Sequence, residues 1–356
     1  MIMENKNMNY TQITKEFSDN FFKLVEDSKN ITITSHFSPD GDSISCVLSM
    51  YRIISDRYPE KKMKIVYSGK IDERFSYFQN FDKIVWAEDM TDEVKDTDLL
   101  IVLDLSIRVR FTRYPEKLEH IKNQICIDHH ASGSEDFTLS TIISEMSSCS
   151  ELIFRIFENN LTLDKNLAEI FLLGILSDTG SFSFVNSSQS ETFSTAKKLL
   201  DVGGIQIDIL KSKYSPMSAK EFTLVQEFIK NTSFEEVQNW PPFQYSYVSR
   251  EFIENGNYSD NEISAASSIY VSMYVRSIKN YTWGFVLKPK NQYYAISARS
   301  LSGSVNVRDL LEKMSLGGGH DRASGGIFKR DGDSNDPQIC IKQIVEWMKN
   351  NKPLMN

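Results

Sequence analysis

Short, continuously apolar runs in the first half of the chain are typical of strands buried on both faces of a sheet. Four such runs are rich in β-branched residues: Asn30–Thr34, Met63–Tyr67, Leu99–Leu103 and Gln124–Ile127. Between and after these runs, apolar residues recur at helical spacing, and the nearly unbroken apolar segment Leu167–Leu176 is long enough to predict a buried helix. This alternation predicts an α/β fold with a doubly wound, mainly parallel sheet.

The second half of the chain has a different pattern. Regular periodicity weakens over Val202–Met217, a short amphipathic helix follows, and Trp240-Pro241-Pro242 comes after it. We therefore expect a first domain over residues 1–205, a linker with a helix over 206–235, and a second domain over 236–356. The second domain mixes predicted strands and helices, which indicates a smaller mixed α/β domain: strands at Gln244–Val248, Trp283–Leu287 and Tyr293–Ala298, and helices near Glu262–Tyr274, Val307–Met314 and Gln338–Lys349. Two domains also suit 356 residues, since single cores stop growing at roughly 250–300.

Charge and composition exclude several classes of protein. The formal net charge of −8 argues against a broad surface that follows the phosphates of a long nucleic acid. No apolar run approaches the roughly 20 residues needed to cross a bilayer, and the first residues lack the order of a signal peptide, so we expect a cytoplasmic protein. Four widely spaced cysteines form no CxxC pair and are predicted to be reduced and structural: Cys46, Cys126, Cys149 and Cys340.

Carboxylates and imidazoles follow three of the four predicted strands. The first strand is followed by His36, Asp40 and Asp42, the third by Asp104, and the fourth by Asp128-His129-His130, while Asp178 ends the predicted buried helix. The carboxyl ends of strands in a parallel open sheet form its ligand crevice, so these side chains are expected to converge.

A single Asp after a strand is more often a helix cap, and a single His is more often an ordinary core or surface residue. Here four of the five histidines lie in motif segments and only His120 does not. Clustered Asp side chains would repel each other unless cations neutralised them, and mixed carboxylate and imidazole ligands suit first-row divalent metals. The sequence therefore predicts a metal site, with two ions.

These segments resemble a known family. HFSPDGDS, LIVLDLS, DHHAS and GILSDTGSFSF are similar to successive motifs of the DHH phosphoesterases, and GGGHDRASGG is similar to the signature of their type 1 associated domain. The resemblance covers nearly the whole chain, and it implies an active site in the cleft between the two domains. The chain departs from the family at Ser38, where Asn is usual, and at Ser45-Cys46, where Gly-Ser is common.

The resemblance implies two Mn2+ ions, with Mg2+ or Co2+ as substitutes, and a bridging water as the nucleophile. One ion would be held by His36, Asp40 and Asp104, and the other by Asp42, Asp104, His129 and Asp178. In this interpretation Asp104 bridges the ions, Asp128 fixes a ring nitrogen, and His130 acts on the phosphate or the leaving oxygen.

The second domain is expected to anchor a nucleotide. Arg299-Ser300 follows a predicted strand, and Gly317-Gly318-Gly319-His320 precedes a segment that could start a helix. Glycines let backbone N–H groups approach a phosphate, and Arg supplies a bidentate fork, although a Gly run alone is more often a turn. Gly325-Gly326 is assigned to tight packing or a turn, and Arg108 and Arg110 to ordinary exposed positions rather than substrate contacts.

The resemblance favours a metal-dependent hydrolase that converts short nucleotides (nano-RNA, pAp, pApA or cyclic di-AMP) to nucleoside monophosphates. The alternatives are a single-strand exonuclease of the RecJ type, which the acidic balance disfavours, and a nucleotide-sensing module without turnover. A family pyrophosphatase lacks GGGH, and alanyl-tRNA editing proteins lack the N-terminal carboxylates. The expected partner is a short nucleotide, with no membrane and no long nucleic acid, and a homodimer is left open.

Overall fold

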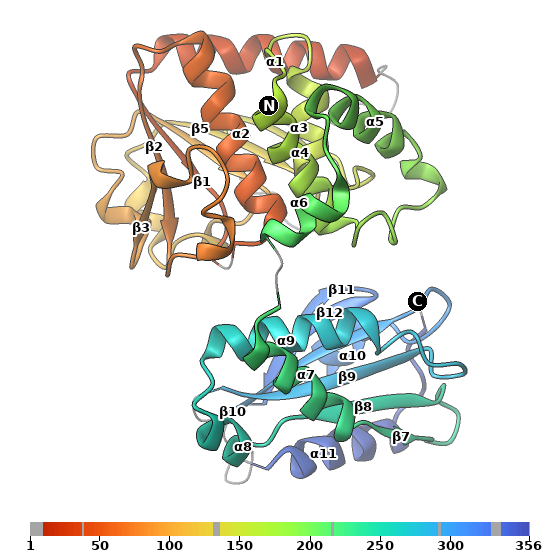
Figure 1. Cartoon of the computed structure of the whole chain (residues 1–356). Helices are drawn as coiled ribbons and strands as arrows, with labels where there is room; N and C mark the ends of the chain where they lie inside the picture. Colours follow the sequence, from red (N-terminus) through yellow and green to blue (C-terminus); the bar gives the residue numbers. More distant parts are fainter. Residues whose placement is uncertain are drawn as a thin grey trace. The chain divides into compact units, whose positions relative to one another are not determined.

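The structure is a computed structural model that describes residues 10–37, 39–130, 136–214, 217–290, 293–328 and 336–355. The chain divides into two compact units, Met1–Pro216 and Met217–Asn356. Each unit has its own six-stranded sheet (Figure 1). The division lies inside the range for which the sequence predicted a linker, residues 206–235.

Every strand pair in the sheet of the first unit is parallel, and the strand order is β3-β2-β1-β4-β5-β6. The strands are β1 (Asn30–Thr34), β2 (Lys62–Ser68), β3 (Ile84–Ala87), β4 (Leu99–Leu103), β5 (Asn123–Asp128) and β6 (Leu139–Ile142). The four predicted strands and the doubly wound α/β fold are confirmed. The sequence missed β3 and β6, which have only four residues each and lie at the two edges of the sheet. The order reverses between β1 and β4, which is where such sheets bind ligands.

The two faces of this sheet are covered differently. The first unit contains α1 (Tyr10–Asp27), α2 (Gly41–Arg57), α3 (Cys149–Phe157), α4 (Lys165–Asp178), α5 (Glu191–Gly203) and α6 (Ile207–Tyr214). Residues of all six helices pack with Ile31, Ile33 and Ile101 in one large core. On the other face, Leu100 and Val102 pack under short 3-10 turns and loops, in a smaller core that includes Met90 and Leu118. The buried helix predicted over Leu167–Leu176 is confirmed as α4.

The sheet of the second unit has the order β11-β12-β10-β9-β8-β7 and is antiparallel except for the parallel pair β8 and β9. Its strands are β7 (Ser233–Glu235), β8 (Phe243–Tyr247), β9 (Trp283–Lys290), β10 (Tyr293–Ser300), β11 (Gly317–His320) and β12 (Ala323–Phe328). The helices α7 (Ala219–Lys230) and α9 (Asp260–Met273) pack against one face, through Val286, together with residues of α8 (Arg250–Gly256). The opposite face packs against α10 (Val307–Lys313) and α11 (Pro337–Lys349). The predicted mixed α/β domain is confirmed.

The two helices within residues 206–235 pack into different units, α6 into the first and α7 into the second. Leu210 of α6 is buried in the first core, whereas Leu224 and Phe228 of α7 are buried in the second. Most of the range predicted as a linker is therefore packed helix.

The glycine run Gly317-Gly318-Gly319 forms most of strand β11. The prediction that a helix could start after this run is wrong, because strand β12 follows it. After a turn at residues 321–322, β12 runs back antiparallel to β11. The strands approach so closely that a Cβ on Gly317 would lie 2.2 Å from the carbonyl oxygen of Gly325, and a Cβ on Gly326 would lie 2.5 Å from that of Leu316. Gly317 and Gly326 therefore permit tight strand packing, which confirms the packing role for Gly326, whereas a Cβ on Gly325 would meet its nearest atom only at 3.6 Å.

All four cysteines are buried, as the sequence predicted, and none of them forms a disulfide within the part of the chain that the structure describes. Among the described residues, no helix combines the length and the apolar character that crossing a membrane requires.

Candidate metal centre

The carboxyl edge of the parallel sheet brings the predicted ligands together. His36 lies two residues beyond β1, Asp104 directly follows β4, and Asp128 ends β5 just before His129. Helices supply the other side chains, since Asp42 is in the first turn of α2 and Asp178 is the last residue of α4. Three groups of residues offer ligand atoms close enough to hold a metal ion: His36, Asp40 and Asp104; Asp42, His129 and Asp178; and Asp104, His129 and His130.

The first group lies between β1 and β4, at the switch point of the sheet. His36 Nε2 is 3.3 Å from Asp104 Oδ2 and 4.0 Å from Asp40 Oδ1. Asp40 is also the N-cap of α2, because its Oδ1 accepts a hydrogen bond of 3.0 Å from the amide of Ser43. The cap interpretation and the ligand interpretation of Asp40 are therefore compatible.

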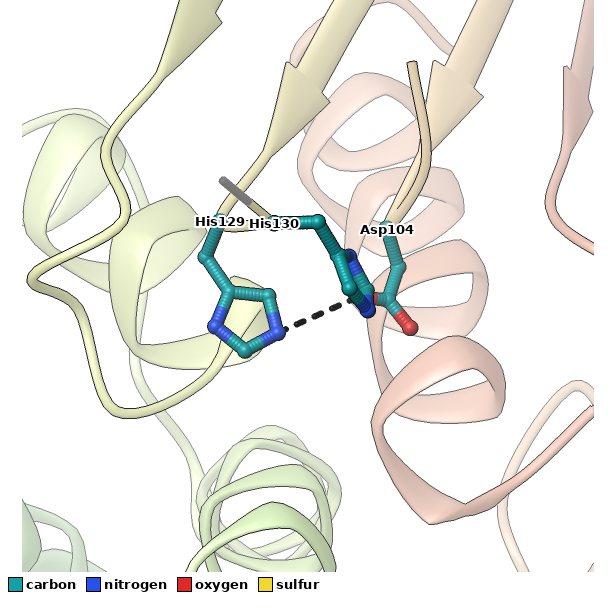
Figure 2. A group of neighbouring side chains, drawn as sticks. All are labelled: Asp104, His129 and His130. Carbon is teal, nitrogen blue, oxygen red and sulfur yellow. Dashed lines mark ion pairs between the residues drawn. The ribbon is translucent and has the colours of Figure 1, made fainter. Parts of the chain in front are cut away.

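The second group surrounds the imidazole of His129. Its Nε2 is 3.0 Å from Asp178 Oδ2, 3.9 Å from Asp42 Oδ2 and 3.5 Å from Asp104 Oδ1. Figure 2 shows the two imidazoles beside Asp104, and its dashed line marks the His129–Asp104 pair. Asp104 thus has one oxygen near His36 and the other near His129, which is the placement required of a carboxylate shared by two sites.

Asp104 is held in a costly conformation and environment. Its φ of +63° is in the left-handed region, and its side chain is 2% exposed. Burial, and then the negative charges of Asp42 and Asp40, raise the pKa of Asp104 well above its ordinary value. The pKa of Asp42 is raised to about 7 by burial and by Asp178. Such backbone strain and clustered like charge are typical of functional sites.

Buried polar atoms without a hydrogen-bond partner show whether a metal ion would fit in this cluster. Among the described residues, Asp104 Oδ1 and His129 Nε2 are buried without a hydrogen-bond partner. A buried polar atom without a partner costs about 1–3 kcal/mol, and a cation would both coordinate these atoms and relieve the repulsion between carboxylates. Carboxylates together with imidazole nitrogens suit a first-row divalent ion, so these residues fit the predicted metals.

Backbone and side-chain acceptors orient the two imidazoles. The carbonyl oxygen of Met146 lies 3.2 Å from His129 Nδ1, which leaves Nε2 to face the carboxylates. Asp128 Oδ1 lies 2.7 Å from His130 Nδ1 and accepts hydrogen bonds from the amides of His129 and His130, at 2.8 Å and 3.1 Å. Burial acts to raise the pKa of Asp128, but the hydrogen bonds and the charge of His130, together with a hydrogen bond from Ser106, act in the opposite direction, and the net effect is a lowered pKa. The ring that Asp128 contacts is therefore that of His130.

The start of α3 holds Asp42, a feature that the sequence analysis missed. The amides of Cys149 and Ser150 donate to Asp42 at 2.7 Å and 2.9 Å, and the N-terminal end of the helix dipole favours this negative charge. Gly174 of α4 makes room here, since a Cβ on it would lie 2.6 Å from Asp42 Oδ1. The pattern Ser148-Cys149-Ser150-Glu151 is a helix-start signal that could have located this end of α3.

In the second unit, strand register aligns the residues predicted to bind substrate. Arg299 of β10 is paired with Ala323 of β12, which in turn is paired with His320 of β11. The side chain of Ser300 is buried, while Gly317 and Gly319 lie exposed and Gly318 partly exposed along β11. Burial, and then the positive charge of Arg276, lower the pKa of Arg299 to about 10.

Other residues named from the sequence have partners within the protein. Arg108 Nη2 donates to Gln124 Oε1 at 2.8 Å and to the carbonyl oxygen of Asp136 at 2.7 Å, and its guanidinium lies over the ring of Phe137. The carbonyl oxygen of Arg110 accepts a hydrogen bond of 2.9 Å from the amide of Phe37. The departure from the family at Ser38 lies outside the described residues.

Comparison with known proteins settles the family. The N-terminal domain of the DHH family matches residues 30–175, and the DHHA1 domain matches residues 242–350. The chain belongs to the DHH family. The resemblance found in the sequence is thereby confirmed for both units.

Two curated relatives and one solved structure are similar over most of the chain. The probable bifunctional oligoribonuclease and PAP phosphatase NrnA of Streptococcus mutans is 28% identical, covering 89% of this chain and 95% of the relative. The cyclic-di-AMP phosphodiesterase GdpP of Bacillus subtilis is 26% identical over 84% of this chain, which spans 45% of that protein. The crystal structure of an exopolyphosphatase-related protein from Bacteroides fragilis covers 97% of this chain and 98% of its own, with 23% identity and a TM-score of 0.81, which supports the fold.

Proposed function

We propose that this DHH family protein is a metal-dependent hydrolase that cleaves phosphoester bonds in short nucleotides. The observation that carries the proposal is the position of Asp104, with one oxygen beside His36 and the other beside His129. The names of the relatives support the same class of substrate, since they include an oligoribonuclease, a PAP phosphatase and a cyclic-di-AMP phosphodiesterase.

Six side chains would hold two divalent ions, with Mn2+ as the first candidate. His36, Asp40 and Asp104 would bind one ion, and Asp42, Asp104, His129 and Asp178 the other. When bound, such ions lower the pKa of a water and stabilise the attacking and leaving oxygens of a phosphoryl group. The carbonyl oxygen of Met146 keeps His129 Nε2 directed at the carboxylates.

His130 is the proposed proton donor. Asp128, whose pKa is lowered, stays ionised and holds a proton on His130 Nδ1. Nε2 is then the nitrogen left for the substrate, and it donates to a phosphate oxygen or to the leaving oxygen when both ring nitrogens carry a proton; such a donor contributes about 10²–10⁴-fold to the rate. Asp128 acts on the reaction through His130.

The second unit is proposed to hold the nucleotide. Arg299 and Lys288 point to the face of the sheet opposite the core that contains Ala298 and Leu287. The pKa of Lys288 is lowered to about 8 by burial and then by the charges of Lys290 and Arg299. Several cations confined to one sheet face suit an anionic ligand such as a nucleotide phosphate.

A substrate panel tests the proposal. Purified protein, first treated with a chelator, is supplied with Mn2+ and assayed on pAp, pApA, cyclic di-AMP and RNAs of two to twenty nucleotides. We expect Mn2+-dependent release of nucleoside monophosphate or phosphate, with kcat/KM falling as RNA lengthens beyond a few nucleotides. A kcat/KM that rises with length favours an exonuclease of the RecJ type. Tight binding without turnover favours a sensing module, and either result contradicts the proposal.

A further inference from the structure

One short segment, Met146–Ser150, positions two of the six proposed ligands. Its first residue provides the carbonyl oxygen near His129 Nδ1, and its last two provide the amides that donate to Asp42. His129 follows β5 and Asp42 lies in α2, so the segment joins parts of the site that are far apart in the sequence. A shift of this segment would move both ligands at once.

Glu151, the next residue, anchors the segment. Its side chain is 1% exposed and accepts hydrogen bonds from Ser147 Oγ at 2.5 Å and Thr192 Oγ1 at 2.8 Å, with Thr195 Oγ1 at 3.5 Å. It also forms an ion pair with Arg155. Thr192 and Thr195 belong to α5, so Glu151 joins the segment to a different helix.

The side chain of Glu151 is directed away from its usual local role. Ser148 is the N-cap of α3 and accepts a hydrogen bond from the amide of Glu151, which places Glu151 where a capping box would return its carboxylate to the cap. Instead, both carboxylate oxygens have partners in Ser147, Arg155 and α5. Burying an ionised carboxylate is costly unless its oxygens are paired, and three side-chain hydroxyls with one guanidinium provide that pairing.

We propose that Glu151 is a positioning residue for the metal centre. It acts through the segment Met146–Ser150, which fixes the ring of His129 and the carboxylate of Asp42. This inference rests on the proposed function, because it requires that these two side chains bind metal. Residues that orient metal ligands typically change metal affinity by about 10–100-fold when they are mutated.

The test is Mn2+ binding to chelator-treated full-length protein, measured by isothermal titration calorimetry. Glu151→Gln keeps the size of the side chain but removes its charge and one acceptor oxygen. We expect the Mn2+ dissociation constant to rise by about 10–100-fold, and activity to recover at saturating Mn2+. Thr192→Val, which removes one hydroxyl donor, is expected to give a smaller rise in the same direction.

The control is Glu158→Gln at the other end of α3. Glu158 also joins α3 to α5, through Lys198 at 2.8 Å, but it is remote in sequence from Met146–Ser150. Thermal unfolding of the metal-free variants measures any shared loss of stability, and Glu158→Gln should bind Mn2+ like the wild type.

Wild-type Mn2+ affinity in folded Glu151→Gln overturns the inference, as does an equal loss in Glu158→Gln. If Glu151→Gln does not fold, Thr192→Val decides: unchanged affinity overturns the inference and weakened affinity supports it. If the wild-type protein itself binds no Mn2+, the proposed function fails and the inference fails with it.

Discussion

The two units keep opposite charges in partly or fully buried positions. In the first unit, carboxylates gather at the carboxyl edge of a parallel sheet, and burial with mutual repulsion raises the pKa values of Asp42 and Asp104. In the second unit, cations gather on one face of a mostly antiparallel sheet, and burial with neighbouring positive charge lowers the pKa values of Lys288 and Arg299. Each cluster is unfavourable for the protein alone, because like charges are brought together out of water. The sign of each cluster is therefore consistent with the ligands proposed above, a metal cation for the first unit and a phosphate anion for the second.

Replacing the central carboxylate, that of Asp104, is expected to have the largest effect on the first unit. Asp104→Asn keeps a residue type that tolerates the left-handed backbone at φ +63°, so the fold should survive. We expect activity to fall by about 10³-fold or more, with metal content falling too, because one side chain serves both proposed ions. Hydrolysis and metal content are measured on the same preparation, and full activity would remove the two-ion proposal.

His130→Ala separates proton donation from metal binding within the first unit. We expect metal content to be retained and kcat to fall by about 10²–10⁴-fold. Asp128→Asn should have a milder effect, because the ring of His130 remains but loses its charged partner at 2.7 Å. Loss of metal from His130→Ala would mean that the roles of His129 and His130 are exchanged.

The second unit should affect binding more than chemistry. Arg299→Ala or His320→Ala is expected to raise KM by about 10-fold or more, since a hydrogen bond to a charged group contributes about 1.5–3 kcal/mol. The value of kcat should change little, because such contacts are made equally in the ground and transition states. Lys349→Ala on α11 controls for loss of positive charge. A fall in kcat at constant KM would contradict this division of roles.

The depressed pKa of Lys288 predicts a weaker effect. With a pKa of about 8, set by burial, Lys290 and Arg299 and opposed by Asp260, this side chain loses its proton as pH rises from 7 to 9. Anion binding should weaken over that range, so KM should rise a few-fold in the wild type. In Lys288→Met the profile of KM against pH should be flatter. Identical profiles would place Lys288 outside the substrate site.

The two units also differ in how closely the backbone is packed around one glycine in each, and substitutions there change no charged group. A Cβ on Gly174 would lie 2.0 Å from Ser150 Oγ, whereas a Cβ on Gly325 would meet its nearest atom at 3.6 Å. Gly174→Ala should therefore destabilise the protein by about 1–3 kcal/mol, the usual cost of overpacking, and Gly325→Ala should be nearly neutral. Thermal unfolding of both variants checks this, and equal midpoints would contradict the close approach of α3 and α4.

The convergence of the proposed metal ligands could be predicted from the sequence because most of them lie at or just beyond the end of a recognisable strand or helix. His36, Asp104 and His129 lie within two residues of the strands that position them, so their convergence follows from the parallel sheet alone. The carbonyl oxygen of Met146 and the amides of Cys149 and Ser150 could not be predicted, since every residue carries such backbone groups. The strand at 317–319 could not be predicted either, because the same residues serve turns and closely packed strands.

Crystals of the protein soaked with Mn2+ would show directly whether two ions share the carboxylate of Asp104, with anomalous diffraction used to locate the metal. We predict two anomalous peaks, both bordered by Asp104, one beside His36 and the other beside His129. A single peak, or peaks that Asp104 does not border, would contradict the claim that this carboxylate is shared by two ions.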